Sequence, residues 1–154
     1  MNKKGFTLIE LLVVIAIIGV LASIMVVNFS NTKGKSADTR RISNLRTLRE
    51  SLANYYSDLG EYPNTGGNNN WESICSGKNW MKTYLVPDYL GMVIIDQREC
   101  SNCQGYEYTS DGIDYKIRNG CFQTDNYTGA GDSYDDPARD WHYGAVYTNG
   151  AKNW

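Results

Sequence analysis

The sequence of 154 residues is short of the residues on which most catalytic sites depend. It holds one histidine, His142, and no serine or cysteine nucleophile signature accompanies it, so nothing resembles a catalytic triad. No glycine-rich loop is followed by the lysine and helix start that cradle a phosphate. These absences argue against an enzyme.

An excess of basic residues is also missing. The net charge is −2, and it becomes −4 (13 basic against 17 acidic residues) without Lys3 and Lys4. A general nucleic-acid surface carries a basic patch, so we expect no nucleic-acid partner. The length suits one small domain.

The chain does have a long apolar run near its N-terminus. Only two residues of the range 11–29 are markedly polar, which meets the threshold of roughly 18 residues for a transmembrane helix. A cleaved secretory signal is the alternative, but its apolar core usually spans about 7–15 residues and ends at a small-residue site. Lys3 and Lys4 would keep the N-terminus cytoplasmic and place the rest of the chain outside.

One carboxylate, Glu10, interrupts the start of this run. A charged side chain in hydrocarbon costs roughly 2.5–3.5 kcal/mol on insertion scales. No basic residue lies between Phe6 and Lys33. The charge of Glu10 therefore requires a partner from elsewhere.

Residues 4–15 (KGFTLIELLVVI) closely resemble the prepilin signal of type IV pilins and type II secretion pseudopilins. The resemblance implies that prepilin peptidase cuts between Gly5 and Phe6 and that the new Phe6 amine is methylated. It also implies that Glu10 pairs with this amine on a neighbouring subunit during filament assembly. Many pilins carry a proline where this chain has Val27, so we expect a continuous helix here.

Helical periodicity continues beyond the apolar run. Apolar residues recur at spacings of three and four, which predicts one core-facing stripe, with the charged residues between them on a solvated or subunit-facing surface. Gly60 predicts the end of the helix. The stripe consists of Ile42, Leu45, Leu48, Leu52, Tyr55 or Tyr56, and Leu59, and the charged residues are Arg40, Arg41, Arg46, Arg49 and Glu50.

The rest of the chain predicts a small sheet. A short helix is expected to end near Leu85, and residues 106–109 and 113–118 alternate around a turn, which favours a hairpin. Residues 143–147 could add a strand. The predicted fold is α+β and resembles a pilin, with a long helix whose second half packs on an antiparallel sheet. The expected parts are a leader (1–5), a transmembrane and assembly helix (6–29), an amphipathic helix half (30–59) and an exported globular region (60–154).

Four cysteines fall in the exported region: Cys75, Cys100, Cys103 and Cys121. An even count outside the cytoplasm predicts two disulfides, and three pairings are possible. The turn of the hairpin would place Cys103 roughly opposite Cys121. This favours a disulfide between these two residues and leaves Cys75 to pair with Cys100. Half of a zinc site at 100–103, or free thiols, are the alternatives.

An acidic, glycine-containing segment, residues 125–140, is the candidate for a cofactor site. Its carboxylates could bind Ca²⁺ on a flexible backbone, and the segment loosely resembles the calcium loop of major pseudopilins. The alternative is a solvated acidic loop. The candidate ligands are Asp125, Asp132, Asp135 and Asp136.

Three functional classes remain open. The first is a structural subunit of a type IV pilus or related pseudopilus. The others are a pilus-displayed adhesin or DNA receptor and a membrane-anchored domain that never assembles. The resemblance implies other pilin subunits, prepilin peptidase, the inner-membrane assembly machinery and membrane lipid as partners. It also implies a single-pass membrane location, with the C-terminal domain outside, followed by an extracellular or periplasmic filament.

Overall fold

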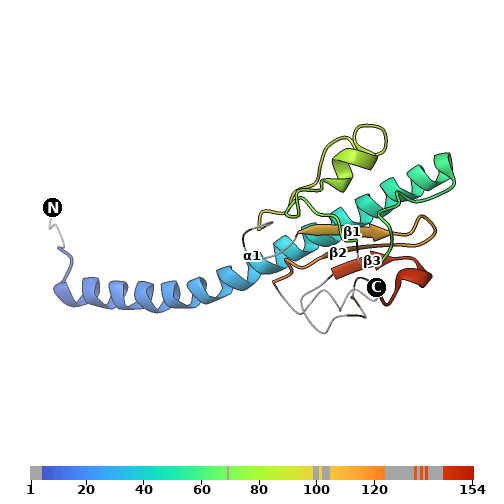
Figure 1. Cartoon of the computed structure of the whole chain (residues 1–154). Coiled ribbons are helices and arrows are strands. Elements are labelled where there is room, and N and C mark those ends of the chain that lie inside the picture. The colour runs from blue at the N-terminus through green and yellow to red at the C-terminus, as the bar shows by residue number, and fades with distance from the viewer. Residues whose placement is uncertain are drawn as a thin grey trace.

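The computed structural model describes residues 5–68, 70–98, 101, 105–123, 134, 136, 138 and 144–154, and within the helix it leaves out the side chains of residues 24–31. The predicted α+β, pilin-like arrangement is confirmed (Figure 1). The elements in chain order are α1 (Leu8–Leu59), the π-type turn η1 (Met81–Leu85), β1 (Tyr106–Ser110), β2 (Tyr115–Asn119), β3 (Gly144–Tyr147) and the 3₁₀ turn η3 (Asn149–Ala151).

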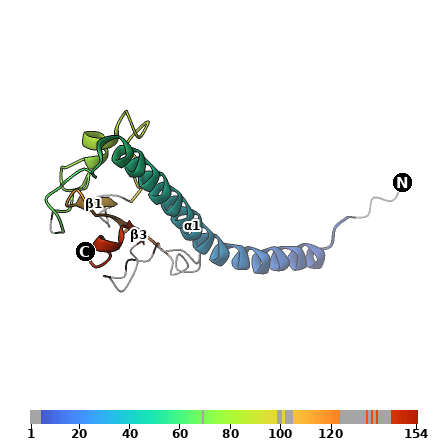
Figure 2. The ribbon, with the colours of Figure 1, turned by 90° about the vertical axis from the view of Figure 1, so that its right-hand side faces the viewer.

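Helix α1 is one uninterrupted element of 52 residues, as the absence of a proline at Val27 predicts. It ends where Gly60 adopts the left-handed conformation (φ 77°) and donates its backbone N–H to Tyr56 O at 2.8 Å. The first half of α1 projects away from the globular part, and the second half carries it (Figures 1 and 2). The two halves therefore meet different surroundings although they share one backbone.

The sheet has the order β1-β2-β3, and both pairs are antiparallel. The predicted hairpin is confirmed, with Ser110 opposite Tyr115. The prediction that Ile113 belongs to a strand is wrong, because the side chain of Asp111 accepts the backbone N–H groups of Ile113 and Asp114 at 2.9 and 2.8 Å. These bonds close a turn that leaves Ile113 78% exposed.

The core forms where the amphipathic stripe of α1 meets the sheet and η1. Leu45, Leu48 and Leu52 are fully buried there, as predicted. The indole of Trp80 stacks on Tyr108 with ring centroids 4.6 Å apart, and its N–H donates to Tyr106 O at 3.1 Å. The other large core residues are Met81, Leu85, Tyr106, Ile117 and Val146.

Two members of the predicted stripe lie outside this core. Leu59 is 56% exposed and Tyr56 is 43% exposed. The sheet packs along the middle of the second half of α1, so the last turn of the helix extends past it (Figure 1). The assignment of Leu59 to the core is therefore wrong.

Replacing Leu48 by alanine tests the core. Because the site is fully enclosed, Leu48→Ala should lower the free energy of unfolding by about 2–5 kcal/mol. Leu59→Ala is the matched control, and we expect less than about 0.5 kcal/mol from it. Chemical denaturation of the full chain in detergent measures both, and equal losses for the two variants would contradict the core placement.

Candidate functional site

The first half of α1 exposes apolar side chains on all sides. From Leu8 to Leu21 its large apolar residues are 45–83% exposed. Soluble monomers rarely expose contiguous apolar patches beyond a few hundred Å², and burying each such side chain contributes roughly 1.5–3 kcal/mol. One face forms an open groove along the helix axis, lined by Leu12, Val13, Ala16, Ile17, Val20 and Leu21. This segment requires an apolar partner.

No helix combines the length and the apolar character of a membrane span within the residues that the structure describes.

Glu10 closes the N-terminal end of this apolar segment. Its Oε2 accepts the backbone N–H of Thr7 at 2.9 Å and the Thr7 hydroxyl at 2.6 Å. Thr7 Oγ1 in turn accepts the backbone N–H of Glu10 at 3.4 Å, which completes a capping box. Gly5 and Phe6 precede the cap, and the ring of Phe6 is 81% exposed.

The capping box gives Glu10 a local role that the sequence reasoning missed. The signal was present, since Thr7 and Glu10 have the spacing of a capping box directly before an apolar run. A carboxylate at the first turn also lies at the positive end of the helix dipole. Both side-chain bonds use Oε2, and among the described residues no hydrogen bond to Oε1 is found. The second oxygen can therefore accept a donor from another chain while the cap stays intact.

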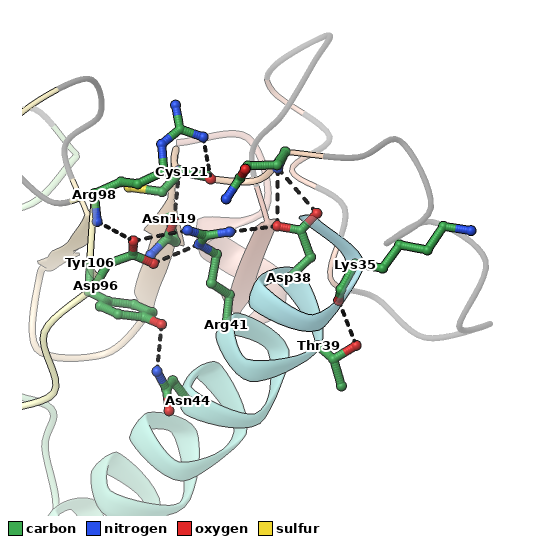
Figure 3. Close-up of polar contacts among 11 residues, drawn as sticks. Lys35, Asp38, Thr39, Arg41, Asn44, Asp96, Arg98, Tyr106, Asn119 and Cys121 are labelled. Carbon is green, nitrogen blue, oxygen red and sulfur yellow. Dashed lines mark hydrogen bonds and ion pairs between the residues drawn. The ribbon is translucent and has the colours of Figure 1, made fainter. Parts of the chain in front are cut away.

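A buried polar cluster ties α1 to the globular part at the point where the helix enters it (Figure 3). Arg41 donates to Asp96 through Nε at 2.6 Å and Nη2 at 3.0 Å, and to Asp38 Oδ1 at 2.7 Å. Asp38 also accepts the backbone N–H of Gln123, and Asp96 accepts that of Arg98. Three segments far apart in the chain thus meet at one guanidinium, which we call the Arg41 cluster.

The electrostatics of the Arg41 cluster favour the ionised form of Asp96 and the charged form of Arg41. Burial by itself raises the pKa of Asp96, but the hydrogen bonds from Arg41 and from the Arg98 backbone outweigh it and leave this pKa below the ordinary value. Burial likewise opposes the charge of Arg41, and Asp96 and Asp38 reverse this, so that its pKa is raised. The charges therefore hold one another in place.

The prediction that Arg41 lies on a solvated or subunit-facing surface is wrong, because its side chain is 4% exposed. Asp38 and Arg41 continue the stripe of Leu45, Leu48 and Leu52 towards the N-terminus at helical spacing. That continuation was a usable signal, although the sequence alone does not provide the partner Asp96, which is 55 positions away from Arg41.

A second buried charge, Lys116 on β2, organises the C-terminal end of the globular part. Its Nζ lies 2.6 Å from Asp136 Oδ1, and both side chains are 0% exposed. The same ammonium donates to the backbone oxygens of Trp154 at 2.8 Å and Lys152 at 3.2 Å, and it lies 5.6 Å from the ring centre of Tyr147. One cation thus holds three segments together.

Only one of the four predicted calcium ligands lies in the described part of the chain. Asp125, Asp132 and Asp135 fall outside it, and the Asp136 carboxylate contacts Lys116 and the backbone N–H of Ala138. The described residues contain no group of three ligating side chains. Calcium binding stays a prediction.

Two of the four cysteines are described. Cys75 and Cys121 are each disulfide-bonded, and no described cysteine is free. Cys100 and Cys103 lie outside the described residues, so the pairing of Cys103 with Cys121 and of Cys75 with Cys100 stays a prediction.

Acid should weaken the contribution of Asp96. Its pKa is ordinary in the unfolded chain (about 3.9) and lower in the folded one, so its contribution is complete above the ordinary pKa and is lost as the pH falls through the folded pKa. We expect Asp96→Asn to cost about 1–3 kcal/mol at neutral pH and progressively less towards pH 3. Denaturation across this range measures it, with the exposed Glu50→Gln as the control. A difference independent of pH would contradict the assignment.

Removing the cation of Lys116 should destabilise the C-terminal end. Lys116→Met keeps most of the length of the side chain but removes the buried ion pair with Asp136, and we expect a loss of about 3–5 kcal/mol in unfolding free energy. The control is Lys82→Met at an exposed position. The double variant Lys116→Met/Asp136→Asn should recover part of the loss, and no recovery would show that the ion pair is not its cause.

Comparison with known proteins finds similarity over part of the chain. Residues 1–26 match the model of the prokaryotic N-terminal methylation motif. The type II secretion system core protein G of Escherichia coli (strain K12) is 42% identical over 64 residues, which cover 42% of this chain and 44% of that protein. Its counterpart in Pectobacterium carotovorum is 41% identical over 64 residues, covering 42% and 41%.

A pilin shows the same similarity. The type IV major pilin protein PilA of Myxococcus xanthus is 38% identical over 61 residues, covering 40% of this chain and 28% of that protein. The matched stretch spans less than half the length of each of these relatives. No solved structure matches the chain. The resemblance to type IV pilins and type II secretion pseudopilins that the sequence predicts is thereby confirmed.

Proposed function

We propose that this protein is a structural subunit of a type IV pilus or a related pseudopilus, which polymerises through the first half of α1. The observation that carries the proposal is the exposed apolar segment with Glu10 at its N-terminal end. Copies of the same segment supply one another with apolar cover, and a filament repeats that contact along its length. The methylation motif at residues 1–26 and the partial similarity to a type II secretion core protein G and to a type IV pilin support this role.

Processing would supply the partner of Glu10. Prepilin peptidase would cut between Gly5 and Phe6, and the released Phe6 amine would be methylated and stay cationic. A cation at the positive end of a helix dipole is unfavourable, so the amine favours a nearby carboxylate. Glu10 Oε1 of a neighbouring subunit can take this role because its own cap uses Oε2.

Before assembly, the same segment would rest in the inner membrane. Residues 8–29 of α1 extend about 33 Å, which suffices for a hydrocarbon core of about 30 Å. Lipid then covers the apolar side chains until other subunits replace it. The globular part would lie outside the cytoplasm, where disulfides form, in agreement with the bonded state of Cys75 and Cys121. The subunit itself performs no catalysis in this proposal.

Variants of Glu10 test the assembly role. Glu10→Gln keeps an acceptor for the N–H of Thr7 but removes the charge, whereas Glu10→Ala removes both. If pairing with the Phe6 amine drives assembly, both variants should reduce filament yield by at least tenfold in the producing cells, as measured by electron microscopy and by shearing.

Two controls sharpen this test. Mass spectrometry of each variant should find an N-terminus at methylated Phe6, which shows that processing is intact, and retention of residues 1–5 in the native protein would contradict processing itself. Normal filaments with Glu10→Gln but not with Glu10→Ala would mean that the cap matters and the charge does not. Normal filaments with both would overturn the assembly role of Glu10.

We also propose that the acidic segment binds calcium, through Asp125, Asp132 and Asp135. The Asp136 carboxylate is paired with Lys116, so we leave this fourth residue out of the proposed ligands. A bound ion stabilises the folded state by mass action, so the melting midpoint of the full chain should fall when a chelator is added and recover with excess Ca²⁺. Asp136→Asn serves as the comparison, because the change in its melting midpoint on adding the chelator should equal that of the wild type. An unchanged midpoint would dismiss calcium.

A further inference from the structure

An open groove of about 450 Å³ lies at the base of the globular part, where α1 emerges from it. One wall is a face of α1 with Lys33, Ser36 and Arg40, and the other carries Gln97 and Gln123 from loops before β1 and after β2. The Arg41 cluster joins these segments directly beside it, since it links Asp38, Asp96 and Gln123 (Figure 3). The groove is therefore shaped by buried contacts.

The groove is cationic. Lys33 and Arg40 are both exposed, and among the described residues no acidic residue lines the groove and no ion pair involves either cation. Of the acidic residues next to the groove in the chain, Asp38 and Asp96 are bound to Arg41, and Glu99 and Asp125 lie outside the described residues. Two cations together with hydroxyl and amide donors match the oxygens of a phosphate group.

The position of the groove along α1 corresponds to the surface of a membrane. If residues 6–29 span the bilayer, Lys33 lies about 6 Å and Arg40 about 16 Å beyond the end of the span. Side chains of a helix lean towards its N-terminus, so both cations extend back towards the bilayer. Lys33 at this height lies within the headgroup layer, which is about 5–8 Å thick on each side, and the long side chain of Arg40 extends towards the layer from above.

We propose that this groove binds the phosphate of an anionic phospholipid in the leaflet from which α1 emerges. The inference rests on the proposed function, because only a subunit held in the bilayer presents the groove to lipid. The bound headgroup holds the globular part against the membrane and fixes the depth of Glu10 in the opposite leaflet. A stored subunit is thereby kept at one height until filament assembly withdraws it.

The test uses the full chain reconstituted in lipid nanodiscs, followed by native mass spectrometry with titrated lipid. Wild type should bind phosphatidylglycerol at least tenfold more tightly than phosphatidylcholine. Because each basic residue near an anionic surface contributes several-fold to binding, Lys33→Gln/Arg40→Gln should weaken phosphatidylglycerol binding about tenfold to thirtyfold. Arg49→Gln/Lys82→Gln removes the same two residue types from exposed positions elsewhere and should leave binding unchanged.

Several outcomes would overturn the proposal. Equal binding of the two lipids, or unaltered phosphatidylglycerol binding by Lys33→Gln/Arg40→Gln, would show that the groove is not a site for anionic lipid. Displacement of the lipid by glycerophosphoglycerol or inorganic phosphate at comparable concentration would mark a site for soluble anions. If Lys33→Gln/Arg40→Gln leaves lipid binding unaltered but reduces the filament yield, the groove contacts a neighbouring subunit and not lipid. Failure of wild type to insert across the bilayer would overturn the proposed function, and this inference with it.

Discussion

The architecture depends on one constraint, which is that a single unbroken helix must satisfy two different surroundings. Its second half buries one stripe against the sheet and η1, with Leu45, Leu48 and Leu52 enclosed. Its first half has no stripe, because apolar residues cover all of its sides and stay exposed. Continuity of the backbone through residues 24–31 joins a folded domain to a segment that gains stability only from an apolar partner.

Charged side chains hold the N-terminal end of α1, its junction with the globular part and the C-terminal end of the globular part. Glu10 satisfies the N-terminal end of α1 through the capping box with Thr7. The Arg41 cluster fastens the helix to the loops at the base of the domain with hydrogen bonds of 2.6–3.1 Å. At the other end of the sheet, Lys116 joins β2 to Asp136 and to the C-terminal residue Trp154. Buried charges of this kind position segments more effectively than they add net stability, because desolvation offsets much of their attraction.

The buried charges also connect the domain to the functional end of the helix. The Arg41 cluster fixes how the loops with Gln97 and Gln123 lie against α1, so it determines the shape of the groove that contains Lys33 and Arg40. In a subunit held in the membrane, the same contacts determine the height and tilt at which the globular part lies. The orientation of the apolar segment is thus set by residues that lie outside it.

Features with a local or periodic cause were readable from the sequence. The apolar run, the stripe of leucines, the stop at Gly60 and the hairpin each depend on residues within a few positions of one another, and all four agree with the structure. There are two exceptions: Leu59, which lies in the last turn of α1 beyond the sheet, and Ile113, where the short-range hydrogen bonds of Asp111 override strand alternation.

Tertiary structure decided which charges are buried. The spacing of Arg41 along the stripe indicates burial, but the sequence does not identify the partners of Arg41 and Lys116, because Asp96 and Asp136 lie 55 and 20 positions away. Whether a charge faces water or a counter-charge depends on how distant segments meet, and sequence periodicity contains no record of that meeting. The sequence by itself determined a capped apolar helix with an acid at its first turn. Only the packing of distant segments determined how the globular part is attached to this helix.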